Sequence, residues 1–140
     1  MGLLSKLREV FGGKSIETFQ ELENDLEKLN KKYNSKLIAF IGTGSKIKGL
    51  PLIYVVEDER DIREFSAKFP ELLKPLNNLS NSNKIQDVSI NYEEEILYFK
   101  PILKNISFVT IYKQKNDIFF IKQWINNKLL VIKNIFHEEE

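Results

Sequence analysis

Residues 36–57 constrain the fold more than any other stretch of this chain. Two short apolar runs, Leu37–Ile41 and Leu52–Val56, are rich in Ile, Val, Phe and Tyr, and the ten residues Gly42–Pro51 between them hold three glycines and a proline. Runs of this length are typical of two antiparallel strands joined by a loop. Neither run alternates apolar with polar residues, which is typical of strands covered on both faces. We therefore expect this hairpin to lie in the middle of a sheet, with helices on at least one side.

Three longer segments carry apolar residues at helical spacing: Ile16–Tyr33, Asp58–Ser80 and Ile118–Phe136. In the second, Pro70 and Pro75 each remove a backbone donor and crowd the preceding turn, so we expect a kink or two shorter helices there. Its apolar stripe is also wider than one neighbouring sheet requires. The surplus favours a second partner, such as another copy of the chain.

The last of these segments allows two interpretations. Phe119–Leu130 contains many residues that favour strand, and it could form a hairpin that turns at Asn126 and Asn127. The helical period continues over all of Ile118–Phe136, however, and Asp117 is placed to cap its start. We therefore predict a helix.

Three strands are predicted between the second and third helices: Ile85–Tyr92, Ile96–Lys100 and Ile106–Lys113. With them, the elements follow in the order helix, strand, strand, helix, strand, strand, strand, helix. A chain of 140 residues is long enough for one domain with a sizeable core. The sequence therefore predicts an α+β fold in a single domain, residues 15–136.

Residues 1–14 are expected to form a separate unit, a short amphipathic helix that ends in a hinge at Gly12 and Gly13. The apolar side of this helix could lie in a membrane interface, or could pack on the domain or on a partner protein. Its members are Leu3, Leu4, Leu7, Val10 and Phe11. At the other end, residues 137–140, HEEE, are expected to form an exposed acidic tail.

Neither catalysis nor a metal site is predicted from the side chains. The chain has no cysteine, and its one histidine, His137, lies in the acidic tail, so no nucleophile is paired with a base. Glu93, Glu94 and Glu95 are neighbours at a turn and should diverge toward solvent rather than hold a metal. We therefore expect a protein that is not an enzyme and that has no catalytic residues and no metal ligands.

The loop Gly42–Pro51 is the one segment that invites a cofactor interpretation. Its glycines and the cations of Lys46 and Lys48 could attract a phosphate. A dinucleotide motif needs a third glycine where Ile47 stands, and it leads into a helix, whereas this loop leads into a strand. We favour a simple hairpin loop and predict no cofactor.

Charge and hydropathy limit the cellular setting. The formal net charge is +1, which gives no general attraction to nucleic acid. No apolar run approaches the roughly 18 residues needed to span a bilayer, and no secretory signal is recognisable. We expect a cytoplasmic protein, with residues 1–11 as the part that would contact a membrane surface.

The order of elements, together with the sequence GLPLIYVVEDE at Gly49–Glu59, resembles the roadblock family, the dynein light chain and small-GTPase regulator domain. In that family a glycine, an apolar residue and often a proline lead from the hairpin turn into the second strand, as Gly49, Leu50 and Pro51 do here. The resemblance covers roughly residues 16–136. It implies a five-stranded antiparallel sheet between helices, and a non-catalytic homodimeric scaffold that binds a small Ras-like GTPase.

The resemblance also implies where two copies would meet: the strand Ile85–Tyr92 and the central helix Ile62–Leu79. An edge strand with alternating apolar residues and only Asp87 as a charged guard would independently favour pairing with another chain. The predicted interface residues are Ile62, Phe65, Phe69, Leu73, Leu76, Ile85, Val88, Ile90 and Tyr92.

Two alternatives keep a similar small sheet-and-helix domain but change the partner. One is a longin-like trafficking module, and the other is a profilin-like actin-binding protein. The profilin-like alternative requires further strands in the C-terminal region, so the conformation of that region distinguishes it from the roadblock interpretation.

Overall fold

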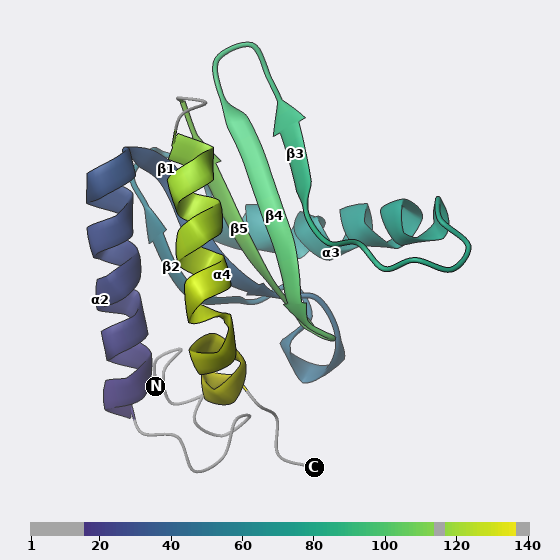
Figure 1. Cartoon of the computed structure of the whole chain (residues 1–140), viewed down its shortest axis with the longest axis horizontal. Helices are drawn as coiled ribbons and strands as arrows, with labels where there is room; N and C mark the ends of the chain where they lie inside the picture. Colours follow the sequence, from purple (N-terminus) through teal and green to yellow (C-terminus); the bar gives the residue numbers. More distant parts are fainter. Residues whose placement is uncertain (1–15, 114–116, 137–140) are drawn as a thin grey trace.

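The computed structural model describes residues 16–113 and 117–136, and Figure 1 shows a sheet that lies between helices on both faces. The helices are α2 (Ile16–Tyr33), α3 (Ile62–Asn78) and α4 (Asp117–Ile135), with a short 3-10 turn, η1 (Ser45–Ile47), in the first hairpin. The strands are β1 (Ser35–Gly42), β2 (Pro51–Val56), β3 (Val88–Asn91), β4 (Ile96–Leu103) and β5 (Ile106–Tyr112). The predicted order of elements is confirmed.

The five strands form one antiparallel sheet in the order β2-β1-β5-β4-β3. The expectation that both strands of the first hairpin lie in the middle of the sheet is half right. β1 is interior, but β2 pairs only with β1 and is an edge strand. Helices on both faces of the sheet, rather than a central position, account for the continuous apolar sequence of β2.

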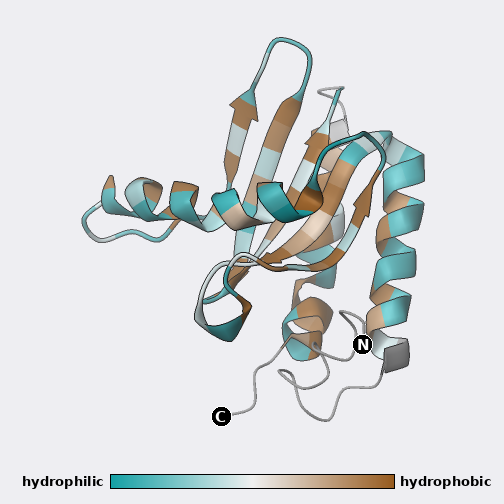
Figure 2. Ribbon diagram, turned by 180° about the vertical axis from the view of Figure 1, so that it is seen from behind, coloured by the Kyte–Doolittle hydropathy of each residue, from teal (hydrophilic) through white to brown (hydrophobic). Residues whose placement is uncertain are grey.

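The core has two parts, one on each face of the sheet. The helices α2 and α4 lie side by side on one face, where Phe19, Phe40 and Phe136 pack with ring centroids 5.3–6.3 Å apart. The helix α3 crosses the other face, where Phe69 meets Phe99 edge to face at 5.0 Å. Figure 2 looks onto α3 from that side.

The loop between β1 and β2 is a hairpin loop in which two positions require glycine for steric reasons. A Cβ on Gly42 would overlap the carbonyl oxygen of Ile47, and Gly49 has a φ of +78°. The Gly49 N–H donates to the Gly42 carbonyl at 2.8 Å, and the Gly42 N–H donates to the Leu50 carbonyl at 2.9 Å. The glycines therefore close a tight turn, as a hairpin loop requires.

One helix, α3, spans both Pro70 and Pro75, so the alternative of two shorter helices is wrong. The side chain of Asp61 caps the start of α3, because it accepts hydrogen bonds from the backbone N–H groups of Arg63 and Glu64. Burial of Phe69 and Pro70 against the sheet offsets the backbone hydrogen bonds that the prolines cannot make.

The C-terminal segment is the helix α4, and the rival hairpin at 119–130 is wrong. Ile121, Ile125 and Ile132 are buried from one face of this helix, which is the periodicity that favoured it. The helix begins at Asp117, whose side chain lies outside the described residues, so its role as a cap stays a prediction.

The strand β3 is shorter than the predicted Ile85–Tyr92, and a proline explains the difference. In the observed register Val88 lies opposite Phe99, so Gln86 would face Pro101. Pro101 has no N–H and cannot complete the next hydrogen-bonded pair. The ladder therefore begins at Val88, and residues 84–87 approach β4 without joining it.

Candidate protein-protein interface

The outer side of β3 is an open edge of the sheet, because β3 pairs only with β4. The N–H of Tyr92 donates to the Glu95 carbonyl at 2.8 Å, which makes that position a hydrogen-bonded pair of the ladder. Such pairs alternate along an antiparallel ladder, so the backbone groups of Val88 and Ile90 point toward β4. The N–H and C=O groups of Ser89 and Asn91 therefore point outward, away from the sheet.

The side chains of β3 divide between the two faces. Val88 and Ile90 are half-buried on the side of α3, whereas Ser89 and Asn91 are exposed on the other side. Ile85, before the strand, is half-buried, and Tyr92, after it, is 55% exposed. The predicted residues on this segment thus lie along the open edge with apolar surface still accessible.

The helix α3 has an apolar flank beside this edge. In Figure 1 the C-terminal part of α3 projects past β3, beyond the edge of the sheet. Phe65 and Leu76 are half-buried, and Leu72 and Leu79 are exposed, Leu79 by 83%. These four residues follow one another at helical spacing along one flank. We call them, together with Val88 and Ile90, the β3-edge surface.

The three other predicted interface residues on α3 pack within the single chain. Phe69 and Leu73 are buried against the sheet, so they hold the helix in place rather than offer surface. Ile62, at the start of the helix, is half-buried against the same cluster. The prediction from sequence did not separate the buried face of the helix from its flank.

Leu72 and Leu79 are the interface candidates that sequence reasoning left out. They fall in the same helical register as Leu76, four residues before it and three after it, and this spacing was the available signal. A second group of exposed apolar residues lies on α4: Phe119, Phe120, Leu130 and Val131. There Phe120 stacks on Tyr33 of α2 at 5.6 Å, which fixes its ring against the neighbouring helix.

Asp87 holds the start of β3 in place from the side of α4. Its carboxylate accepts a hydrogen bond from the Tyr98 hydroxyl at 3.0 Å, and Lys122 Nζ lies 3.9 Å from the same oxygen. Burial of the phenol, with the nearby Asp87 carboxylate, raises the pKa of Tyr98 well above its ordinary value. Asp87 therefore holds the edge strand against β4 and α4, and it also places a negative charge beside that edge.

The predicted divergence of the three glutamates after β3 is partly right. Glu93 and Glu94 are exposed, whereas Glu95 accepts from Lys36 Nζ at 3.0 Å and lies 3.7 Å from Arg60. Within the described ranges, no three His, Asp or Glu side chains gather as they would around a metal ion. Glu95 instead ties the β3–β4 turn to the start of β1.

The predicted amphipathic helix, with Leu3, Leu4, Leu7, Val10 and Phe11, lies outside the described residues, and so does the tail 137–140. Among the helices that are described, none is long and apolar enough to cross a membrane.

Solved structures identify the fold. The chain superposes on Myxococcus xanthus MglB with a TM-score of 0.72 at 12% identity, covering 87% of this chain and 95% of that one. It superposes on the gliding protein MglB of Thermus thermophilus with a TM-score of 0.68 at 11% identity, covering 88% and 94%. The chain has the roadblock fold.

A third similar structure is described as MglB with a tetrameric arrangement, and it matches with a TM-score of 0.68 at 11% identity over 88% of this chain and 93% of that one. No protein-family model matches the sequence, and no curated protein matches it. The roadblock fold is therefore evident from the architecture rather than from sequence similarity. The C-terminal helix α4 also stands where the profilin-like alternative requires strands, which favours the roadblock interpretation.

Proposed function

We propose that this protein is a non-catalytic scaffold that forms a homodimer through the β3-edge surface and binds a small Ras-like GTPase. The observation that carries the proposal is the open edge of β3 beside an uncovered apolar flank of α3. An exposed edge strand is a template for pairing with another chain, and exposed apolar patches commonly mark interaction sites.

The geometry of β3 suits pairing with its own copy. In an antiparallel pair with a two-fold axis at Ile90, Ser89 of one protomer would face Asn91 of the partner subunit, and the reverse. Both residues point their backbone groups outward, so each of the two pairs would exchange two N–H···O=C bonds. The same two-fold axis would bring the projecting ends of the two α3 helices toward the joint sheet, where Leu72, Leu76 and Leu79 would lose contact with water.

One of the similar structures supports self-association. It is an MglB with a tetrameric arrangement. The resemblance of this chain to the roadblock family supports a small Ras-like GTPase as the partner. The amphipathic residues 1–11 would then contact a membrane surface or a second protein and hold the dimer near it.

The experiment is a titration of purified Ras-like GTPases from the same genome, loaded with GDP or with a non-hydrolysable GTP analogue, into the full chain. We expect saturable binding of at least one of them, with different affinities for the two nucleotide states, because a regulator must distinguish those states. Val88→Lys, which places a charge in the shared seam, should weaken this binding if the partner contacts both protomers. Absence of binding by every such GTPase in both states would contradict the proposed partner, whatever the oligomeric state.

A further inference from the structure

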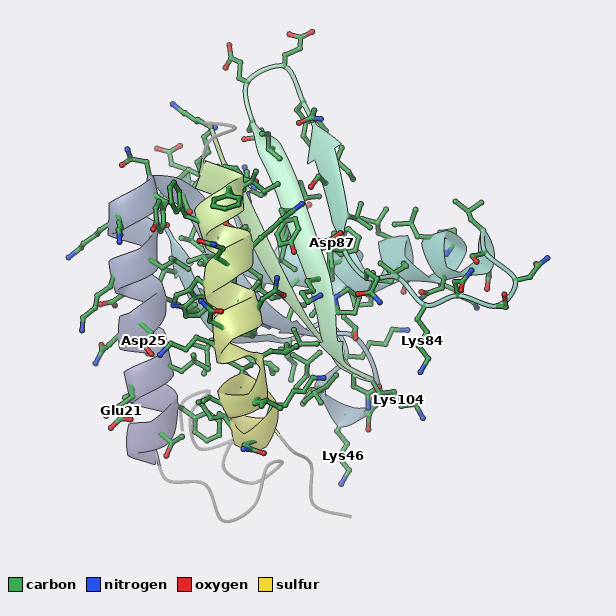
Figure 3. The ribbon with its side chains drawn as sticks, in the orientation of Figure 1. Glu21, Asp25, Lys46, Lys84, Asp87 and Lys104 are labelled. Atoms are coloured by element: carbon green, nitrogen blue, oxygen red, sulfur yellow. The ribbon has the colours of Figure 1, made fainter. Side chains whose placement is uncertain are left out.

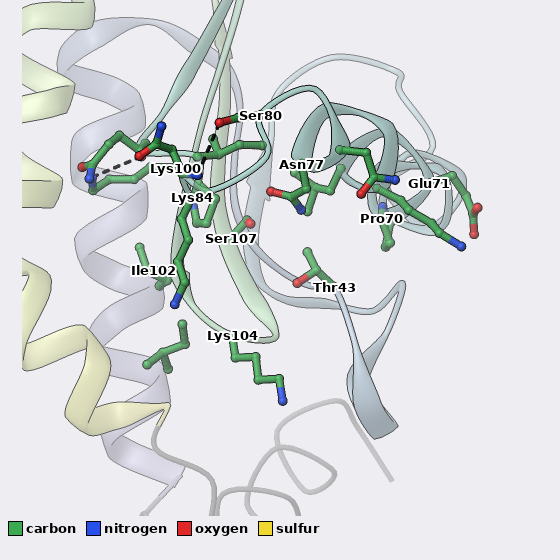
Figure 4. Close-up of a pocket in the computed structure, with 18 of the residues that line it drawn as sticks. Thr43, Pro70, Glu71, Asn77, Ser80, Lys84, Lys100, Ile102, Lys104 and Ser107 are labelled. Atoms are coloured by element: carbon green, nitrogen blue, oxygen red, sulfur yellow. Dashed lines mark hydrogen bonds between the residues drawn. The ribbon is translucent and has the colours of Figure 1, made fainter.

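A wide groove opens at the end of the sheet opposite the β3–β4 turn, and Figure 4 shows it in close-up. It has a volume of about 1270 Å³ and lies between the C-terminal half of α3, the segment 80–86 and the β4–β5 turn. The flank of α3 that faces it carries Lys74, Asn77 and Asn78. This polar flank differs in chemistry from the apolar flank of the same helix that belongs to the β3-edge surface.

The charged lining of the groove is almost entirely basic. It contains six lysines and one acid, Glu71, and no arginine or aspartate. The lysines are Lys48, Lys74, Lys84, Lys100, Lys104 and Lys133. They come from six separate parts of the chain, from the first hairpin to α4, so only the fold brings them together.

Most of these ammonium groups lack a carboxylate partner. Lys48 lies 3.8 Å from Glu71, where both side chains are largely exposed, and Lys100 Nζ donates to the Gln86 carbonyl at 3.3 Å. In residues 16–113 and 117–136, the other four lysines form no ion pair. Six lysines with only one acid among the described lining residues produce a positive potential that is strongest inside the groove.

A buried hydroxyl in the wall of the groove also favours a bound ligand. Ser107 on β5 contributes to the wall of the groove, is 1% exposed, and its Oγ has no hydrogen-bond partner among the described atoms. A buried polar atom without a partner is costly unless a ligand or water satisfies it. Asn77, Ser80 and Thr43 also line the groove, and their amide and hydroxyl groups add neutral donors to it (Figure 4).

The net charge of +1 conceals this concentration of lysines. In Figure 3, Lys46, Lys84 and Lys104 extend on one side of the molecule, whereas Glu21 and Asp25 lie on α2, on the other side. The basic groove is therefore a local feature that the net charge of the whole chain does not reveal.

We propose that this basic groove binds a ligand that carries several phosphate groups, either a free polyphosphorylated small molecule or the headgroup of a phosphorylated lipid. Lysine binds phosphate as a point charge and does not need the planar fork that arginine offers to carboxylates. Six lysines spread along a groove match several phosphates on one scaffold better than a single anion. This ligand site is separate from the proposed dimer contact and GTPase partner, and binding to it can be measured without a dimer or a GTPase.

The test is calorimetric titration of inositol hexakisphosphate and of inorganic tripolyphosphate into the full chain at low salt, beside sedimentation with vesicles. One vesicle preparation contains a phosphoinositide, and a second contains phosphatidylserine at equal surface charge. Binding of the soluble probes identifies a free ligand. Binding only to the phosphoinositide vesicles identifies a lipid headgroup, and both results support the groove.

The matched variants are two pairs of exposed lysines. Lys84→Ala with Lys104→Ala removes two charges from the groove, and Lys28→Ala with Lys31→Ala removes two from the far surface of α2. At about fivefold for each lysine, the first pair should weaken binding roughly 25-fold, and the second by less than about twofold. Equal losses in both pairs, no binding of any probe, or equally tight binding of a polyglutamate peptide would overturn the proposal.

Discussion

The two edge strands of the sheet, β2 and β3, look alike in their backbones and differ in what surrounds them. On β2, the Glu57 N–H donates to the Lys36 carbonyl, so by alternation the N–H groups of Tyr54 and Val56 point outward. On β3 the same reasoning turns Ser89 and Asn91 outward. Both edges therefore offer backbone donors and acceptors to another strand.

The two edges differ in how far the side chains beside them are buried. Leu52 and Ile53 of β2 are buried, and α2 packs against both β2 and β1. No residue of β3 is buried, and the apolar flank of α3 stands uncovered next to it. An open edge alone thus does not define an interface. We propose that an interface forms at an open edge that lies beside uncovered apolar surface, because only there does pairing also remove apolar area from water.

The largest effect is expected from a charge on β3. Val88→Lys would bury an ammonium group without a partner in the dimer seam, and we expect dimer affinity to fall by at least about 100-fold. Val56→Lys is the matched control, because Val56 is also a half-buried valine on an edge strand and packs on the same side of the sheet. The solution mass of each variant distinguishes them. A dimer split by Val56→Lys and not by Val88→Lys would show that the wrong edge was chosen.

A smaller effect is expected from removing one outward donor. Ser89→Pro deletes an N–H that does not bond to β4, so the β3–β4 ladder should survive while two intermolecular bonds per dimer are lost. At about 1 kcal/mol per bond, dimer affinity should fall roughly 30-fold. Ser89→Ala keeps the N–H and should leave the affinity unchanged. Sedimentation equilibrium measures both, and equal affinity of the proline and alanine variants would exclude pairing through this edge.

The C-terminal end of the apolar flank of α3 should contribute less to dimer affinity than β3 does. Leu79→Ser removes a side chain that is exposed in the single chain and would be partly covered in the proposed dimer, so we expect about fivefold weaker dimerisation. Leu130→Ser on α4 is the control, because Leu130 is 78% exposed in a helix on the other face of the sheet. Equal weakening by both variants, measured by the same sedimentation experiment, would place the contact elsewhere.

The smallest effect concerns the anchor of β3. Tyr98→Phe removes the hydrogen bond to Asp87 and should lower the free energy of unfolding by about 1 kcal/mol. The raised pKa of Tyr98 also has a consequence for pH. Above about pH 10 the unfolded chain loses this proton while the folded chain keeps it. Stability should therefore fall as pH rises beyond that value.

Urea denaturation at pH 8 and at pH 10.5 measures both parts of this prediction. The loss of stability between the two pH values should be smaller in Tyr98→Phe than in the unaltered chain. An equal loss in both proteins would mean that the Tyr98 phenol does not hold its proton more tightly in the folded state.

Periodic patterns in the sequence were sufficient for most of the fold. The helix at Ile16–Tyr33 has the predicted bounds, because its apolar residues recur without interruption. The length of β3 was not predictable from its own residues, since it is set by Pro101 on the neighbouring strand. The place of β2 at the edge was likewise hidden, because a strand covered by helices has the same composition at an edge as in the interior.

The candidate sites divide in the same way. Val88, Ile90 and Leu76 could be identified from alternation and helical spacing, which are local properties. The burial of Phe69, in contrast with the exposure of Leu72, depends on the rotation of α3 on the sheet, and no local pattern fixes that rotation. The lysines of the groove are separated by up to 85 positions, from Lys48 to Lys133, and only tertiary structure makes them neighbours.

Amide hydrogen exchange at the two edge strands tests the central claim most directly. If a second copy completes the sheet at β3, the amides of Ser89 and Asn91 will be protected nearly as well as those of Val88 and Ile90, and protection will increase with protein concentration. The amides of Tyr54 and Val56 on β2 will exchange quickly at every concentration. Fast exchange at Ser89 and Asn91 throughout, or protection that appears at β2 instead, would contradict the account.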